Sequence, residues 1–119
     1  MHNFKQLTVW QKSIDLTIKV YSVLSAFPTD EKYGLGSQIK RSAVSVPSNI
    51  GEGAGRKSSK EFKHFLSISL GSLFELETQI ILAHRLHLID EANMNQISFQ
   101  ITEIQKMIYS LERSIKITN

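Results

Sequence analysis

The C-terminal third of the chain carries the pattern that most limits what this sequence can fold into. Between Met94 and Ile115, seven apolar residues recur at alternating steps of three and four. This spacing places all seven on one face of an α-helix, and a seam sustained over three heptads is typical of a helix packed lengthwise against partners. Asp90, a favourable N-cap residue, stands just before the seam. The pattern predicts a long helix over residues 90–116 in a helical bundle.

Three earlier segments have the same helical periodicity, and no segment alternates with period two for long enough to predict a strand. These segments are residues 8–26, 33–54 and 58–86. Long helices joined by short turns favour an arrangement in which successive helices run in opposite directions. The sequence therefore predicts an all-α fold, an antiparallel up-down-up-down four-helix bundle that forms one domain over residues 1–119.

Two of the predicted helices begin with a capping-box pattern. Ser58 is followed three residues later by Glu61, and Thr8 is followed in the same way by Gln11. In such a box the hydroxyl accepts a hydrogen bond from a backbone N–H of the first helical turn, which has no partner within the helix. We therefore expect helices to begin at Ser58 and Thr8.

The first predicted helix is apolar on two faces, and we expect one stripe to face the core. That stripe is Trp10, Ile14, Thr17, Tyr21 and Leu24, and the second stripe beside it is Val9, Leu16, Val20, Val23 and Phe27. A monomeric bundle needs only about 100° of each helix for its core. The surplus apolar surface favours a homo-oligomer, and the alternative is that wide apolar faces simply wrap a thick core.

The stretch AVSVPSNIGEGAGRKS, residues 43–58, has some features of a phosphate-binding loop but not its spacing. A P-loop needs Gly-x-x-x-x-Gly-Lys-Ser/Thr after a buried strand. Here three residues separate Gly51 from Gly55, and Arg56 stands before Lys57. The chain also has no strand pattern on which a nucleotide-binding fold is built. Nucleotide binding is therefore not predicted.

Proline and glycine in this stretch have a structural interpretation instead. Pro47 lies inside a helical pattern, where it lacks the N–H that would bond to the carbonyl of Ala43, so we expect a bend in this helix. Ser45 and Ser48 lie near enough in sequence to hydrogen-bond around the defect. The glycines allow close approach of a neighbouring helix and, at the helix end, an exit with positive φ.

The net charge of +3 is unevenly distributed along the chain. Residues 32–64 contain seven Lys or Arg and only two acids. This imbalance predicts a basic patch that binds the phosphates of RNA or DNA. No aromatic platform or base-reading motif is evident in the sequence, so we expect binding to depend on the charge and shape of the nucleic-acid backbone. The alternative for each residue is an ordinary solvated surface charge. The predicted nucleic-acid-binding residues are Lys40, Arg56, Lys57, Lys60, Lys63 and His64.

Three stretches resemble a known family. They are LTVWQKSIDL, FPTDEKYGLGSQIKRSAVSVPSNIGEGAGRKSSKEF and FLSISLGSLFELETQIILAHRL, which cover most of residues 7–88. In order and spacing they resemble the four-helix-bundle family of 23S rRNA intervening-sequence proteins. Members are encoded in insertions of bacterial large-subunit rRNA genes. Related accessory proteins of diversity-generating retroelements bind nucleic acid and a reverse transcriptase through a basic surface.

The resemblance implies a bundle that assembles into a closed homo-oligomer, with a pentameric ring as the best expectation. The polar signature of the family falls here on Arg41, Ser45, Ser48, Asn49, Glu52, Glu75 and Glu77. We expect Arg41 to join Glu52 or Glu75 in a polar network between helices or subunits. His87 stands where the family commonly ends a helix with glycine, so a left-handed cap is less expected there.

The residue types do not predict an enzyme. His84 and His87 are three apart but lack the accompanying carboxylate of a zinc motif, while Glu75 and Glu77 point in different directions on a helix. No arginine precedes a histidine at the spacing of HEPN-type RNases. We therefore predict a non-catalytic protein with no metal and no cofactor.

The absence of cysteine fits a reducing compartment, and no continuous apolar run has the length of a membrane span. We expect a cytoplasmic protein without a membrane partner. The leading functional hypothesis is a homo-oligomeric module that binds RNA or DNA. The alternative is a structural scaffold for protein–protein contacts, in which the basic patch has no role in nucleic-acid binding.

Overall fold

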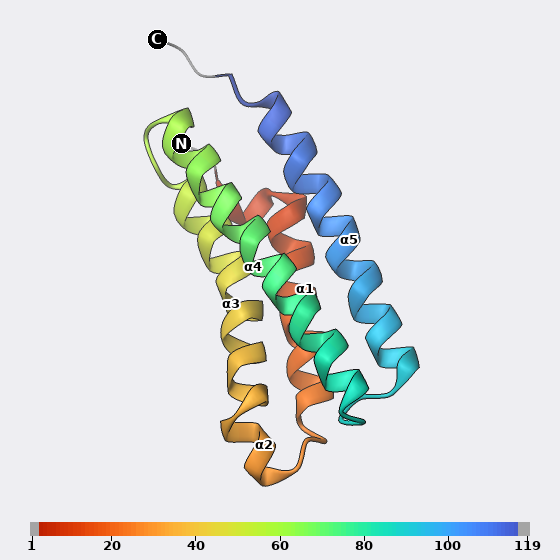
Figure 1. Ribbon diagram of the computed structural model, residues 1–119. Coiled ribbons are helices and arrows are strands. Elements are labelled where there is room, and N and C mark those ends of the chain that lie inside the picture. The colour runs from red at the N-terminus through yellow and green to blue at the C-terminus, as the bar shows by residue number, and fades with distance from the viewer. Residues whose placement is uncertain (1–2, 117–119) are drawn as a thin grey trace.

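The periodic segments form four long helices within residues 3–116, the part of the chain that the computed structural model describes (Figure 1). These helices are α1 (Thr8–Leu24), α3 (Leu35–Ala54), α4 (Ser59–Arg85) and α5 (Glu91–Ser114). A 3-10 turn, η1 (Phe4–Gln6), precedes α1, and a short helix, α2 (Thr29–Tyr33), precedes α3. No strand occurs in this range, so the predicted all-α class is confirmed. Residues 1–2 and 117–119 of the predicted domain lie outside the described residues.

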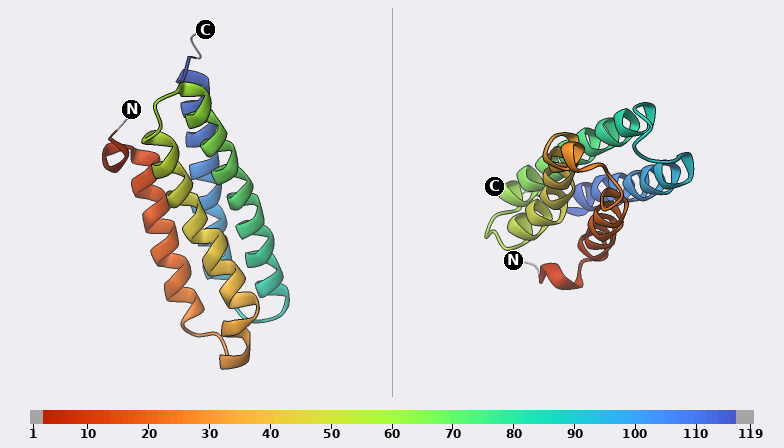
Figure 2. Two further views of the ribbon diagram at one scale, coloured as in Figure 1. Left: turned by 90° about the vertical axis from the view of Figure 1, so that its left-hand side faces the viewer. Right: turned by 90° about the horizontal axis from the view of Figure 1, so that it is seen from below.

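The long helices lie side by side and alternate in direction (Figures 1 and 2). α1 packs against α3 and α5, and α4 packs against the same two helices. The molecule is elongated, with extents of 51 × 23 × 21 Å. The alternation places η1, the α3–α4 turn and the end of α5 together at one end, which we call the α3–α4 end. α2 and the α4–α5 turn form the opposite end, the α2 end.

The core lies where the apolar seams of the four helices meet. In α5, the seam that the sequence predicts is buried through the middle of the helix, at Ile97, Ile101, Ile104 and Ile108. In α4 the buried residues recur at helical spacing from Phe62 to Ala83. The predicted seam of α5 and the predicted helical periodicity of residues 58–86 are therefore confirmed.

The face of α1 that points into the core is not the one predicted. Its buried residues are Val9, Ser13, Leu16, Val20 and Leu24. Ser13 is tolerated there because its hydroxyl donates to the carbonyl of Trp10 at 2.7 Å, which satisfies the buried polar group. Only Leu24 of the predicted inward stripe is buried, and Tyr21 is 44% exposed. The rest of that stripe borders α3 near the surface.

The predicted caps at Ser58 and Asp90 are confirmed, and α1 begins at Thr8 as predicted but without the predicted capping box. Ser58 accepts a hydrogen bond from the N–H of Glu61 at 3.1 Å, and Asp90 accepts one from the N–H of Asn93 at 2.8 Å. At the start of α1, however, Leu7 is the N-cap and no side chain caps the helix. The amide of Gln11 reaches back to the carbonyl of Lys5 at 2.9 Å, because η1 folds against this end of α1.

α3 runs through Pro47 from Leu35 to Ala54 without interruption, and the predicted bend stays a prediction. The carbonyl of Ala43, which Pro47 cannot reach with an N–H, accepts a hydrogen bond from the Thr17 hydroxyl of α1 at 3.2 Å. The expectation that Ser45 would serve this defect was wrong. Its hydroxyl lies 2.8 Å from that of Ser72 on α4 instead.

The two helix ends that depend on backbone conformation also differ from expectation. The residue after α3, Gly55, has a φ of −81°, so α3 ends without a positive φ. His87 has a φ of 62° after α4. Here the N–H of Leu88 bonds to the carbonyl of Ala83 and that of His87 to the carbonyl of His84, which is the Schellman pattern. A left-handed cap therefore forms without glycine.

α4 is the one helix among the described residues that is long and apolar enough to cross a membrane, by length and composition alone. The sequence was searched for continuous apolar runs, and α4 contains none of sufficient length. It meets the criterion for a membrane span by the mean hydropathy of a window within the helix. Only 28% of its apolar window is buried in the single chain. One face of α4 therefore fills the core, and the other leaves apolar side chains at the surface.

Candidate nucleic-acid interface

Charge is segregated along the length of the bundle. At the α3–α4 end, described residues 3–6, 52–64 and 112–116 contain seven Lys or Arg and three Glu. At the α2 end, residues 25–35 and 82–93 contain two Lys or Arg and four acids. One end of a 51 Å rod is therefore basic and the other acidic. Such a distribution attracts a polyanion to the basic end.

Four of the predicted nucleic-acid-binding residues lie in the α3–α4 turn and the first turns of α4. Lys57, Lys60 and His64 are exposed, and Lys63 is half-buried. Lys60 and His64 are four residues apart, so they share one face of the first two turns of α4. The structure thus brings together four of the six residues predicted to bind nucleic acid.

Arg56, the fifth predicted residue, is already engaged within the chain. Its guanidinium lies 2.6 Å from the carboxylate of Glu52 and 5.0 Å from the centre of the Phe65 ring. These contacts tie the end of α3 to α4 across the turn. The ion pair neutralises most of the charge that Arg56 would offer to a phosphate. Its role in this geometry is to position the turn.

Lys40, the sixth predicted residue, does not join the patch. It lies on α3 sixteen residues before Arg56, which corresponds to about 24 Å along a helix. Its ammonium sits 5.0 Å from the centre of the Tyr21 ring of α1. The prediction of one continuous patch was wrong for this residue, because Lys40 faces α1 at mid-height while the turn lies at the bundle end.

Three further cations complete the basic end and were missed from the sequence. Lys5 belongs to η1, Arg113 to the last turn of α5, and Lys116 follows that helix. They are more than fifty residues from the α3–α4 turn but share its end of the bundle (Figure 2). The signal for them was the predicted alternation of helix directions, which brings the start of the first helix and the end of the last helix to the α3–α4 turn.

The predicted polar network is centred between α3 and α4. The Ser42 hydroxyl lies 2.6 Å from the Glu75 carboxylate and 2.9 Å from the Gln79 amide oxygen. One turn away, the amide of Asn49 donates to the Ser45 hydroxyl at 3.0 Å. Small residues at this seam let the two helices approach closely. Ser42 was not predicted as a member.

Arg41 does not pair with either predicted carboxylate inside the described chain. Its guanidinium donates to the Ser37 hydroxyl at 3.4 Å, while Glu52 pairs with Arg56. Arg41 and Glu75 nevertheless line the same shallow cleft between α3 and α4. A pairing of these two residues between subunits stays a prediction.

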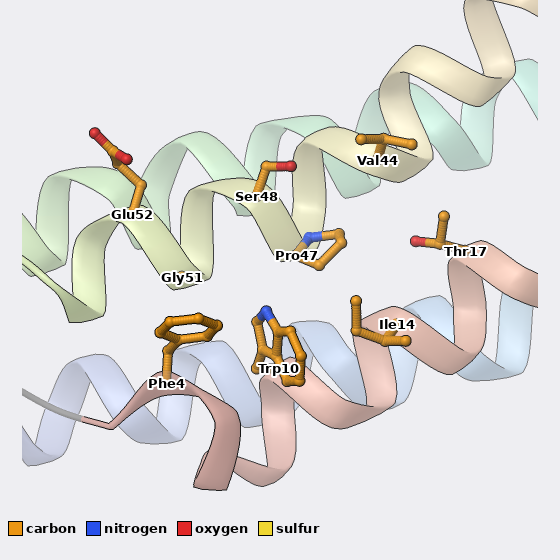
Figure 3. Close-up of a pocket in the computed structure, with 9 residues that line it drawn as sticks. All are labelled: Phe4, Trp10, Ile14, Thr17, Val44, Pro47, Ser48, Gly51 and Glu52. Carbon is orange, nitrogen blue, oxygen red and sulfur yellow. The ribbon is translucent and has the colours of Figure 1, made fainter.

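A second cleft, which we call the α1/α3 groove, opens between α1 and α3. It has a volume of about 570 Å³. It is lined by Phe4, Trp10, Ile14, Thr17, Val44, Pro47, Ser48, Gly51 and Glu52. Figure 3 shows the Phe4, Trp10 and Ile14 side chains pointing toward α3, whereas Glu52 points away from the groove. The predicted stripe of α1 that does not enter the core forms the floor and wall of this groove.

The described histidines and carboxylates do not assemble a metal centre. No group of three or more His, Cys, Asp or Glu side chains within residues 3–116 is placed to hold a metal ion. His84 lies in the last turn of α4 and His87 forms its left-handed cap, so both lie at the α2 end.

Comparisons with known proteins agree with this architecture. A family model described as 23S rRNA-intervening sequence protein matches residues 5–110. The chain belongs to this family.

A solved structure supports the assignment to the family of 23S rRNA-intervening sequence proteins. It is that of a protein with unknown function from the S23 ribosomal protein family of Bacteroides thetaiotaomicron VPI-5482. The two chains are 25% identical with a TM-score of 0.83, and the match covers 90% of this chain and 100% of that chain. No curated protein matches the sequence. The resemblance inferred from the sequence motifs is confirmed.

Proposed function

We propose that this chain is a non-catalytic, homo-oligomeric module that binds the backbone of RNA or DNA at the α3–α4 end. The observation that carries the proposal is the concentration of cations at this end, where described Lys and Arg outnumber Glu by seven to three. Lys57 and Lys60 are exposed at the start of α4, where the positive end of the helix dipole also favours anions. Phosphate contacts of this kind are independent of sequence.

The ligand class follows from the chemistry of this end. Lysines at this end offer point charges, whereas Phe62 is buried and Phe65 is half-buried beneath Arg56, which leaves His64 as the one exposed ring among these lysines. Binding that rests on such charges releases counterions, so the affinity falls steeply with salt. We therefore propose a backbone contact that tolerates many sequences. The membership of the family supports a link to RNA, since its description names an rRNA intervening sequence.

The test is salt-dependent binding of the full chain to labelled generic RNA and single-stranded DNA, read by fluorescence anisotropy. Lys57→Glu with Lys60→Glu should lower the affinity more than about tenfold and reduce the slope of log K against log salt by about 1.4, or 0.7 per lost contact. The matched control is Lys32→Glu with Arg85→Glu, an equal charge change at exposed positions of the α2 end. It should retain most of the binding.

Two outcomes would reject nucleic-acid binding at this end. Equal losses in the two double variants would mean that net charge alone attracts the nucleic acid. No retention of RNA or DNA by the wild-type chain at low salt would favour the second candidate, a scaffold for protein–protein contacts. The apolar side chains left exposed on α1 and α4 are the observation that favours that scaffold.

A further inference from the structure

Two of the surfaces on which the described chain leaves apolar side chains exposed lie on α1 with α3 and on α4. One is the α1/α3 groove, and Ile18, 63% exposed, and Tyr21, 44% exposed, follow its lining residues Ile14 and Thr17 by one turn of α1. The other is the outer face of α4, where Phe74 is 51% exposed and Leu82 is 46% exposed. Exposed apolar side chains that gather on one face of a small bundle usually mark a contact with another molecule.

The outer face of α4 has the form of a helix-packing seam. Ile68, Gly71, Glu75, Thr78 and Leu82 are all exposed and follow one another at steps of three, four, three and four. This is the heptad spacing of a helix that lies lengthwise in a groove. The same helix uses its opposite face, from Phe62 to Ala83, for the core of its own chain.

Gly71 at the middle of this seam is not explained within the chain. Glycine is, after proline, the least favourable residue in a helix interior. A Cβ atom added at Gly71 would have no neighbour within 4 Å, so no contact inside the described chain requires glycine there. By contrast, a Cβ atom added at Gly53 would lie 2.6 Å from Phe65. Gly71 is the glycine whose partner would have to come from outside the chain.

The two surfaces lie at the same height along the bundle. Ser72 of α4 contacts Ser45 of α3, and Ser69 donates to the carbonyl of Val46 at 3.0 Å. Gly71 is therefore level with the part of α3 that contributes Val44 and Pro47 to the groove. Copies related by rotation about an axis parallel to the bundle keep such heights aligned.

The charges that flank these surfaces are complementary. Arg41 is exposed on the outer side of α3 and has no carboxylate partner among the described residues, where it contacts Ser37. Glu75 is exposed in the α4 seam and bonds to Ser42 with no cation partner in the same range. Both lie at mid-height, since Arg41 is next to Ser42 in sequence. Both side chains line the α3/α4 cleft, but no ion pair joins them within the described chain, so each can pair with a neighbouring copy.

We propose that the α1/α3 groove of one copy receives the outer face of α4 of a second copy, with Gly71 at the closest approach. Arg41 then faces Glu75 of the partner subunit. Two different surfaces meet, so the contact is heterologous and each copy can bind one neighbour on each side. This assignment rests on the homo-oligomer in the proposed function but does not depend on nucleic-acid binding. No Lys or Arg lines the groove, and Glu52 borders it, so its apolar lining suits a helix face better than the anionic backbone of a nucleic acid.

Gly71→Leu is the first variant, measured by sedimentation velocity over protein concentrations up to about 100 µM. Leucine is a strong helix former and meets no atom within 4 Å of its Cβ, so the chain should fold normally, as circular dichroism will show. Overpacking of the contact should weaken assembly by about tenfold or more. Thr102→Leu, at an exposed position on α5, is the matched control and should assemble like the wild type.

A charge exchange tests the pairing between copies. Arg41→Glu and Glu75→Arg should each weaken assembly when studied alone, because like charges then meet at every contact. An equimolar mixture of the two variant proteins should regain assembly, since every contact between unlike copies restores an opposite pair; a closed ring with an odd number of copies keeps one like-charged contact, so the rescue can stop at even or open assemblies. A pairing inside one chain would give no such rescue by mixing.

Several results would overturn the assignment. A wild-type chain that stays monomeric at about 100 µM removes both this interface and the proposed homo-oligomer. Assembly of Gly71→Leu at wild-type strength, or no rescue in the mixture, removes this interface alone. Trp10 is the single tryptophan, and its emission should change on dilution. A change of that emission only with RNA, or only with neutral phosphatidylcholine vesicles, would assign the groove to those ligands instead.

Discussion

The hydroxyl of Thr17 is predicted to stabilise the fold by replacing the hydrogen bond that Pro47 removes from α3. Pro47 has no N–H, so the carbonyl of Ala43 loses its partner within the helix. Ala43 is fully buried, which excludes water from that carbonyl. The Thr17 hydroxyl, 3.2 Å away, also lies 2.8 Å from the carbonyl of Ser13. The carbonyl of Ser13 already accepts the backbone N–H of Thr17 within the helix. The hydroxyl proton of Thr17 therefore stabilises the fold more when it bonds to the carbonyl of Ala43, which has no other partner in α3.

The perturbation is Thr17→Val, which keeps the shape of the side chain and removes the hydroxyl. A buried carbonyl left without a partner costs about 1–3 kcal/mol. Valine and threonine have similar helix propensities, so little is gained or lost elsewhere in α1. We expect the free energy of unfolding to fall by about 1.5 kcal/mol, which lowers the melting midpoint of a chain of this size by about 4–8 °C.

The assay is a double-mutant cycle with Pro47→Ala, followed by urea unfolding at one fixed protein concentration, since assembly would shift the midpoint. Pro47→Ala restores an N–H at position 47 that can reach the carbonyl of Ala43. In that background Thr17→Val should cost less than about 0.5 kcal/mol, giving a coupling of about 1 kcal/mol. Equal costs of Thr17→Val in the two backgrounds would refute the reasoning, because the hydroxyl would then not be replacing the missing bond.

Two further substitutions test backbone positions. His87→Gly should raise the free energy of unfolding by about 0.5–1 kcal/mol in thermal melts, because a non-glycine residue at a φ of 62° is strained; His87→Ala should give no such gain. Gly53→Ala should lower the melting midpoint, since a Cβ atom 2.6 Å from Phe65 forces α3 and α4 apart at a cost of about 1–3 kcal/mol, more than the gain in helix propensity. A rise for Gly53→Ala would show that the helix contact relaxes freely.

The helices themselves were predictable because their apolar spacing is regular. The α5 seam and the caps at Ser58 and Asp90 depend on residues close in sequence, and the structure confirms them. The core face of α1 was not predictable in this way, since two adjacent stripes are both apolar. Ser13 belongs to the buried stripe only because a local hydrogen bond satisfies its hydroxyl, and counting it as polar favours the wrong face.

The candidate site was predicted in part, for a related reason. Lys57, Lys60 and Lys63 are neighbours in sequence, so their proximity needed no tertiary information. Lys40 was grouped with them by sequence distance, but a helix carries it about 24 Å away. Lys5 and Arg113 join the basic end only through the alternating directions of the four helices. The ion pair of Arg56 with Glu52, which removes a cation from the site, requires side-chain geometry that spacing alone does not provide.

The difference in charge between the two ends of the bundle connects the proposed oligomer with the proposed nucleic-acid binding. If the groove of one copy receives α4 of the next at the same height, all copies point in the same direction and their α3–α4 ends gather on one rim. Each single end carries a modest excess of four positive charges among the described residues, too few for tight binding at physiological salt. Several such ends on one rim engage a flexible polyanion together, and each added contact becomes intramolecular after the first. Assembly through a surface distinct from the basic end would thus turn a weak electrostatic patch into an effective one.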